Sequence, residues 1–332
     1  MNIDHAHGNK AFRAAPFIKE IGRGSKGARS MSREDARSVY AAMLDGRVSD
    51  LELGALVLAM RIKGETVDEI AGFMDAAEQS FNKLPMPDSD YAPIVIPSYN
   101  GSRQMPNLTP LLALLLAQRG APVLIHGVSS DPGRVTTAEI LSELGFAVAL
   151  TYGDVQRGFA RREPVFITIE ALAPKIARLL AIRRVLGVRN STHTLVKILQ
   201  PFAGAALRLT SYTHPEYLDM LTAYFGSAAP AERGDAFLMR GTEGETVANA
   251  KRAQQISWFH EHQCTVLVQK QDPVDELPPL PLQSDAATTA AWIKAVLAGE
   301  QPVPAPIAEQ VEHCLHVARL LHARQVSHGE AG

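Results

Sequence analysis

Cysteine and aromatic residues are scarce in this 332-residue sequence, and long apolar runs are absent. The two cysteines, Cys264 and Cys314, are too far apart to form a metal-binding motif, and so little cysteine is typical of a reducing compartment. The longest apolar run, Leu111 to Ala117, is far shorter than the roughly 20 residues that span a bilayer. The N-terminus lacks the apolar segment of a secretion signal. We therefore expect a cytoplasmic protein that does not enter a membrane.

The composition is that of a folded protein with a sizeable core. Hydrophobic residues make up 46% of the chain and charged residues 20%, which excludes a disordered or fibrous protein. Aromatic residues reach only 6%, so few rings are available to stack on nucleic-acid bases.

The net charge is only −2, but the cations are concentrated in two segments. Residues 10–29 hold six Lys and Arg against one carboxylate, and residues 157–208 hold ten against two. Such segregation creates a field that attracts polyanions although the whole chain is slightly acidic. A single basic segment is more often a solvated helix face, whereas two such segments favour a polyanionic ligand.

Hydrophobic periodicity divides the sequence into a helical part and an alternating part. Apolar residues recur every three or four positions from about 14 to 81, which predicts a small helical domain over 14–82. A linker with two prolines follows at 83–90. Beyond it, short β-rich runs alternate with helical stretches and predict a layered α/β domain over 91–326. The expected strands are 93–96, 122–126, 164–169, 207–210, 236–239 and 265–268.

A loop rich in small polar residues, 97–109, connects the first predicted strand to the next predicted helix. Backbone N–H groups at such a turn, together with a helix N-terminus, can bind an anion. Small polar residues also suit an ordinary turn, so the loop alone does not establish a phosphate site.

Several motifs, spread in order along nearly the whole chain, resemble those of anthranilate phosphoribosyltransferase. A closer resemblance is to its non-biosynthetic, nucleic-acid-binding sister group, the YbiB-type proteins. The segments that carry it are KEIGRG (19–24), DLELG (50–54), RIKGE (61–65), PSYNG (97–101), HGVS (126–129), GVRNS (187–191), HTL (193–195) and HPEY (214–217). The resemblance implies a small helical domain, which commonly forms the dimer contact in this family and to which a later segment around 170–200 contributes. It also implies a larger α/β domain of the nucleoside-phosphorylase and phosphoribosyltransferase-like type.

The sequence differs from the enzyme's pattern at the positions that bind the diphosphate of the sugar donor and the magnesium ion. The enzyme wraps the diphosphate of its donor with glycines, which let the backbone approach phosphate closely, whereas this chain has proline and tyrosine within 97–101. The acids that hold magnesium in the enzyme correspond to Thr246 and Val247, although Glu243 and Glu245 are near. The resemblance therefore implies a transferase-like protein that has lost phosphoribosyl transfer. We assign no catalytic residue, no metal ligand and no cofactor.

Two sets of candidate residues result. The cations predicted to bind nucleic acid are Lys19, Arg23, Lys26, Arg29, Lys175, Arg178, Arg183, Arg184, Arg189 and Lys197. The residues that could bind phosphate in the loop and next to it are Ser98, Asn100, Gly101, Asn107, Thr109, His126, Gly127 and Arg134. Helical periodicity places Lys175 and Arg178 on one face. It aligns Arg183 with the apolar side of the same helix, toward the acceptor cleft that the resemblance implies.

We predict a homodimer that binds DNA or RNA, in single-stranded or irregular form, through phosphate contacts with little sequence preference. The alternative is a glycosyltransferase or phosphoribosyltransferase that uses a phosphorylated sugar donor and Mg at the loop 97–109. A scaffold that binds other proteins is a third possibility.

Overall fold

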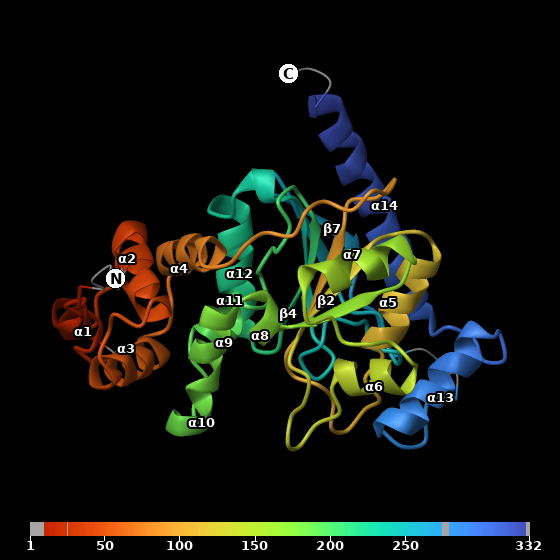
Figure 1. Cartoon of the computed structure of the whole chain (residues 1–332), viewed down its shortest axis with the longest axis horizontal. Coiled ribbons are helices and arrows are strands. Elements are labelled where there is room, and N and C mark those ends of the chain that lie inside the picture. Colours follow the sequence, from red (N-terminus) through yellow and green to blue (C-terminus); the bar gives the residue numbers. More distant parts are fainter. Residues whose placement is uncertain (1–9, 25, 274–278, 330–332) are drawn as a thin grey trace, which may run out of the picture. The chain divides into compact units, whose positions relative to one another are not determined.

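The computed structural model describes residues 10–24, 26–273 and 279–329, and the chain divides into two compact units (Figure 1). The helical unit comprises Met1–Phe81 and Ala173–Leu195. The α/β unit comprises Asn82–Leu172 and Val196–Gly332. The later segment that contains half of the candidate cations therefore belongs with the N-terminal helices. Within the described residues, no helix combines the length and apolar character that crossing a membrane requires.

The helical unit is built from short helices with strong N-terminal caps. Its helices are α1 (Ala15–Ile21), α2 (Arg33–Leu44), α3 (Asp50–Lys63), α4 (Val67–Gln79), α9 (Pro174–Ala181), α10 (Arg183–Leu186) and α11 (Thr192–Leu195). Ser32, Ser49 and Thr66 each accept a hydrogen bond from a backbone N–H in the first turn of α2, α3 and α4. Helix α2 packs against α4 and α9, and α1 packs against α3.

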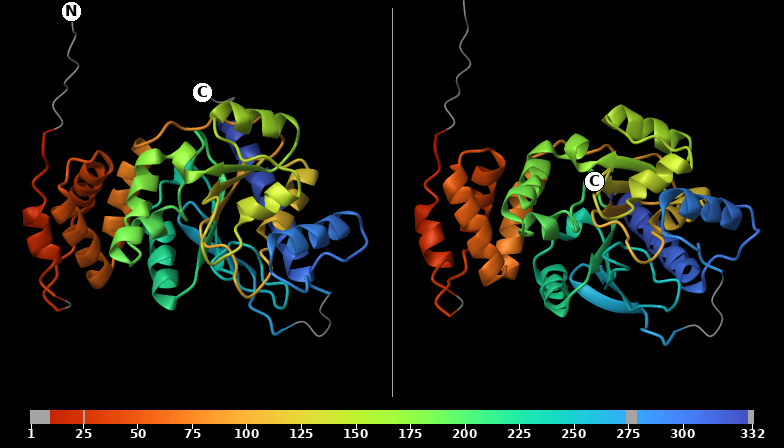
Figure 2. Two further views of the ribbon diagram at one scale, coloured as in Figure 1. Left: turned by 60° about the horizontal axis from the view of Figure 1, so that its bottom comes forward. Right: turned by 90° about the horizontal axis from the view of Figure 1, so that it is seen from below.

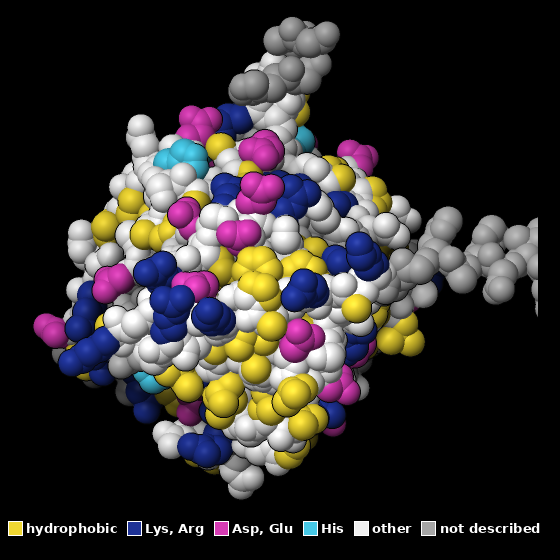
Figure 3. All heavy atoms as spheres, turned by 90° about the vertical axis from the view of Figure 1, so that its left-hand side faces the viewer, with side chains coloured by type: hydrophobic (Ala, Val, Ile, Leu, Met, Phe, Trp, Pro, Cys, Tyr) yellow, Lys and Arg dark blue, Asp and Glu magenta, His cyan; other side chains and the backbone are white. Residues whose placement is uncertain are grey.

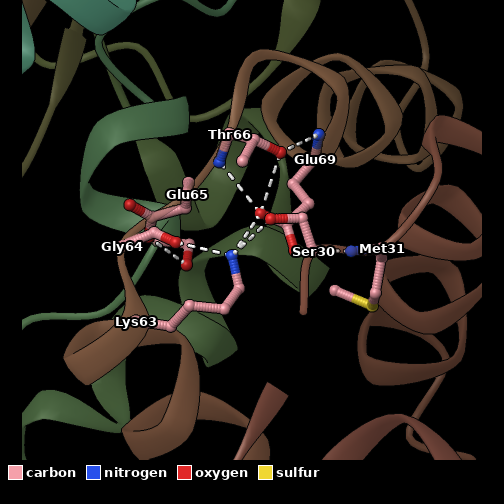
Figure 4. Close-up of polar contacts among 8 residues, drawn as sticks. Ser30, Met31, Lys63, Gly64, Glu65, Thr66 and Glu69 are labelled. Atoms are coloured by element: carbon pink, nitrogen blue, oxygen red, sulfur yellow. Dashed lines mark hydrogen bonds and ion pairs between the residues drawn. The ribbon is translucent and has the colours of Figure 1, made fainter. Parts of the chain in front are cut away.

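A buried ion pair fixes the start of α4 and the end of the basic N-terminal segment (Figure 4). The carboxylate of Glu69 is fully buried and accepts from Lys63 Nζ at 2.7 Å and from the Thr66 N–H at 2.9 Å. It also accepts from the Met31 N–H at 2.9 Å. Because Met31 precedes Ser32, the N-cap residue of α2, this carboxylate holds the segment 26–31 to the helical bundle.

The α/β unit contains one twisted sheet with strand order β3-β2-β1-β4-β5-β6-β7. The strands are β1 (Ile94–Ser98), β2 (Val123–Gly127), β3 (Val165–Thr168), β4 (Leu207–Tyr212), β5 (Ala236–Arg240), β6 (Ile256–His260) and β7 (Gln263–Val268). The first five are parallel, while β6 and β7 are antiparallel. The strand order reverses between β1 and β4, and the carboxyl ends of strands at such a reversal are where α/β sheets bind ligands.

Helices cover the sheet and complete the hydrophobic core. They are α5 (Thr109–Gln118), α6 (Thr137–Glu143), α7 (Tyr152–Ala160), α8 (Ile169–Leu172), α12 (Pro215–Ser227), α13 (Ala286–Leu297) and α14 (Ala305–Gly329), with the 3-10 helix η1 (Ala231–Arg233). Helix α5 is apolar on nearly all sides because it is buried in the core. The predicted α/β architecture with a small helical domain is confirmed.

Replacing Glu69 by Gln removes the charge that compensates Lys63 while keeping the shape of the side chain. We expect the free energy of unfolding to fall by about 3 kcal/mol, because removing one partner of a buried ion pair leaves the other charge uncompensated. Chemical denaturation of the native chain and the variant measures this difference. Glu34→Gln, at an exposed position in the first turn of α2, is the control and should change stability by less than about 1 kcal/mol. Equal losses in the two variants would contradict the assigned role of Glu69.

Candidate functional site

The N-terminal cations lie at the end of α1 and on the hydrogen-bonded segment that follows it. Helix α1 ends at Ile21, and the Arg29 N–H donates back to the Glu20 carbonyl at 3.1 Å. The Glu20 carboxylate pairs with Arg23 at 2.6 Å and lies 3.9 Å from Arg29. Lys19 and Lys26 are exposed, and the described part of the chain gives neither of them an ion pair.

Two cations of the second basic segment connect α9 to α2. Lys175 Nζ lies 2.7 Å from Asp45 Oδ1, and this hydrogen bond is the main cause that lowers the pKa of Asp45. The guanidinium of Arg178 donates to the carbonyls of Met43 and Leu44 at 2.9 and 2.7 Å. These carbonyls lie in the last turn of α2, where a cation compensates the negative end of the helix dipole. Both side chains therefore have a structural function.

Arg183 and Arg184 are exposed on α10, and no ion pair reaches either of them within the described residues. Helix α9 ends at Ala181, and the next helical turn begins at Arg183, with Ile182 between them in a helical conformation. Arg189 is also exposed, beyond the left-handed Gly187 that ends α10.

The two basic segments lie on different sides of the helical unit. Helix α1 packs on α3, while α9 packs on α2 and α11. Figures 1 and 2 show α2, α3 and α4 between α1 and the α9–α10 segment. Lys197, the remaining predicted cation, belongs to the α/β unit, where its ammonium donates to the Gly244 carbonyl at 3.3 Å. The segments therefore do not form one continuous surface within a single helical unit.

An apolar stripe runs along the exposed face of α3 beside the N-terminal basic segment. Leu51, Leu58 and Ile62 are 86%, 48% and 64% exposed. With Ala55 they follow a spacing of four, three and four residues, which places them on one side of the helix. A groove of about 210 Å³ borders this stripe, and Ile21, Gly24 and Ala28 lie along it. Figure 3 shows hydrophobic side chains gathered on this face with cations around them.

The predicted phosphate-binding side chains lie at the carboxyl ends of β1 and β2, where Ser98 is paired with Gly127. Ser98 Oγ donates to Thr137 Oγ1 at 2.8 Å, and Asn107 Nδ2 donates to the same oxygen at 3.0 Å. Asn107 Oδ1 accepts from the Thr109 N–H at 3.1 Å. A Cβ on Gly127 would lie 1.7 Å from the Ser98 carbonyl oxygen, so this glycine is required by close strand packing. Ser98 and Asn107 are thus buried and hydrogen-bonded, whereas the buried Thr109 hydroxyl has no hydrogen-bond partner among the described residues.

His126 is a neutral, buried side chain. It is fully buried, and burial lowers its pKa to about 3. The Tyr99 hydroxyl lies 2.7 Å from His126 Nδ1, and burial, with the charge of Glu170 as a second cause, raises the pKa of Tyr99. An imidazole that stays uncharged at neutral pH gives no electrostatic attraction for phosphate.

The backbone N–H groups that follow β1 already have acceptors. Those of Asn100 and Gly101 donate to Glu245 Oε1 at 2.9 and 2.7 Å. Those of Arg103 and Gln104 donate to the carboxylate of Glu243. Arg134 donates to the Gly101 carbonyl at 3.2 Å, and the same nitrogen lies 3.5 Å from the Glu243 carbonyl. Sequence reasoning noted that Glu243 and Glu245 lie near the lost magnesium ligands, but it did not predict that they bind this loop.

No group of three or more His, Cys, Asp or Glu residues in the described part of the chain is arranged to hold a metal ion. The carboxylates nearest to the expected magnesium position are those that accept from the loop. Their oxygens are directed to backbone N–H groups, and this arrangement does not fit a magnesium ion with a bound diphosphate.

Comparison with known proteins identifies the family. A family model described as glycosyl transferase family, helical bundle domain, matches residues 15–80. The uncharacterized protein YbiB of Escherichia coli (strain K12) is 47% identical over 301 residues, which cover 90% of this chain and 92% of YbiB. The chain belongs to the anthranilate phosphoribosyltransferase-like family that includes YbiB.

More distant members of this family share the fold. The anthranilate phosphoribosyltransferase of Methanopyrus kandleri is 25% identical over 301 residues, covering 87% of this chain and 84% of that protein. The crystal structure of the enzyme from Thermus thermophilus superposes with a TM-score of 0.67 at 20% identity, covering 92% of this chain and 89% of that one. The enzyme from Saccharomyces cerevisiae in complex with PRPP and Mg gives 0.66 at 13% identity, over 93% and 88%.

Proposed function

We propose that this protein is a cytoplasmic homodimer that binds nucleic acid through phosphate contacts and does not transfer phosphoribosyl groups. The observation that carries the proposal is the exposure of Arg183 and Arg184 on α10. Other cations of the same segment, Lys175 and Arg178, are held by groups on α2. Two adjacent arginines without carboxylate partners among the described residues are available to a ligand with closely spaced negative charges.

The chemistry of these cations favours binding without base recognition. Each phosphate that an Arg or Lys neutralises releases counterions from the nucleic acid, and this gain does not depend on sequence. Exposed aromatic platforms, which would stack on bases, are scarce in a chain with 6% aromatic residues. Phosphate contacts alone suit DNA and RNA of many sequences.

The apolar stripe on α3 supports a dimer formed by two helical units. Large hydrophobic side chains in a continuous row on a solvent-exposed helix face favour burial against another helix. A second copy supplies the same row, and a two-fold contact pairs it with itself. Lys26 lies on the basic segment whose neighbours, Gly24 and Ala28, border the groove beside the stripe. Such a dimer would therefore bring the two N-terminal basic segments toward one another.

Reversing the charges at Arg183 and Arg184 tests the nucleic-acid interface. We expect Arg183→Glu with Arg184→Glu to weaken binding to unrelated oligonucleotides by at least about tenfold at 50 mM salt, because two phosphate contacts are lost. Fluorescence anisotropy with labelled DNA and RNA strands measures the dissociation constants. Lys251→Glu with Arg252→Glu, at exposed positions of the α/β unit, is the matched control. Equal effects of the two double variants, or loss confined to one sequence, would contradict the proposal.

Introducing charge into the apolar stripe tests the dimer. We expect the native chain to have a mass of about twice 35.9 kDa in light scattering after gel filtration, and Leu58→Glu with Ile62→Glu to give a monomer. The monomer should keep its helical circular dichroism, since both side chains are exposed in the single chain. A monomeric native protein, or a variant that stays dimeric, would exclude this face as the dimer contact.

A further inference from the structure

Four backbone N–H groups at the carboxyl end of β1 donate to carboxylates from a turn more than one hundred residues further along the chain. We call residues 98–104 the amide loop and residues 242–245 the acidic turn. Within the α/β unit, the N–H groups of Asn100 and Gly101 converge on one oxygen of Glu245. Consecutive N–H groups that converge on one point form a concave anion site. In this chain, the anion in that site is the protein's own carboxylate.

The acidic turn adopts a conformation that presents both carboxylates to the amide loop. Thr242 and Glu245 close the turn with two backbone hydrogen bonds of 3.0 Å. Glu243 has a φ of 52°, a left-handed conformation that residues other than glycine rarely adopt. From this position its carboxylate accepts from the Arg103 and Gln104 N–H groups. The backbone of the turn is therefore held in an unusual conformation in which its two acids reach four amides.

The acidic turn packs closely against the amide loop at Gly244. A Cβ on Gly244 would lie 2.1 Å from Asn100 Nδ2, which donates to the Gly244 carbonyl at 2.7 Å. Ser211 and Lys197 donate to the same carbonyl at 3.1 and 3.3 Å. These donors hold the acidic turn against the loop from its other side.

The second oxygen of Glu245 shows how strongly this carboxylate depends on the amide loop. Glu245 is fully buried, and its Oε2 has no hydrogen-bond partner among the described residues. A buried, unpaired carboxylate oxygen is energetically costly. The two amide donors at Oε1 compensate this cost and hold the carboxyl group in place. Phosphate is also an anion with several oxygens, so the two amides that donate to Glu245 could equally donate to a phosphate.

We propose that the acidic turn is a built-in anion that fills the phosphate site of the amide loop. The loop is thereby closed to the diphosphate of a sugar donor, and it becomes a diphosphate site only when the two carboxylates are removed. The N–H groups that a diphosphate would need already donate to Glu243 and Glu245. The carboxylates of these two residues would also repel the negative charge of the diphosphate. This proposal concerns the α/β unit alone and does not depend on whether the chain binds nucleic acid.

Titration of the full-length protein with inorganic pyrophosphate, without metal and at low ionic strength, tests the proposal. We expect calorimetry to detect no saturable binding to the native chain up to about 10 mM ligand, and binding at least about tenfold stronger by Glu243→Ala with Glu245→Ala. Glu245→Gln is the matched control, because its amide oxygen can still accept from the loop, and it should not bind pyrophosphate.

The backbone amide signals in NMR spectra show where on the protein pyrophosphate binds. In the double variant the ¹⁵N–¹H signals of Asn100 and Gly101 should shift on addition of pyrophosphate, whereas in the native chain they should not. Should the double variant fail to fold, Glu243→Ser with Glu245→Ser replaces it, since this pair also removes both carboxylates but keeps short polar side chains. Pyrophosphate binding by the native chain with shifts at Asn100 and Gly101 would overturn the proposal. A folded variant that lacks both carboxylates and binds pyrophosphate no better than the native chain would overturn it as well.

Discussion

The hydrogen bonds from the Asn100 and Gly101 amides to one buried oxygen of Glu245 are the constraint on which the rest of the α/β unit depends. They join the end of β1 to the turn after β5, at the point where the strand order of the sheet reverses. In open α/β sheets this point is the usual ligand site. Here it is filled by side chains of the chain itself, so the transferase fold is kept while its anion site is used for internal structure.

In the helical unit, some charged side chains form ion pairs that stabilise the fold, whereas others are exposed to solvent. Glu69 holds the basic segment to α4, Asp45 holds Lys175, and Glu20 holds Arg23. Lys26, on the segment after α1, and Arg183 and Arg184, on α10, are exposed and have no ion pair within the described residues. Because α2, α3 and α4 separate the segment after α1 from α10, one helical unit offers two small basic areas, and a larger anion-binding surface requires a second copy.

The sequence was sufficient to predict the two domains and most central strands, because apolar runs such as that of β1 are local signals. Strand β6 was missed because Ser257 and His260 interrupt its apolar pattern, and α12 was missed because its apolar and polar residues do not form a clear stripe. The amide loop was recognised as a candidate anion site from its small residues. Its occupant could not be predicted, because Asn100 and Glu245 are 145 positions apart and only the fold brings them together. The same holds for the Lys175–Asp45 pair.

The central claim is that exposed cations of the helical unit bind phosphates of nucleic acid. The most direct measurement is the affinity of the native protein for unrelated single-stranded oligonucleotides as a function of salt. We expect a dissociation constant that rises at least about tenfold between 50 and 200 mM salt, with similar slopes for DNA and RNA of different sequence. Absence of binding at 50 mM salt, or an affinity that does not change with salt, would contradict it.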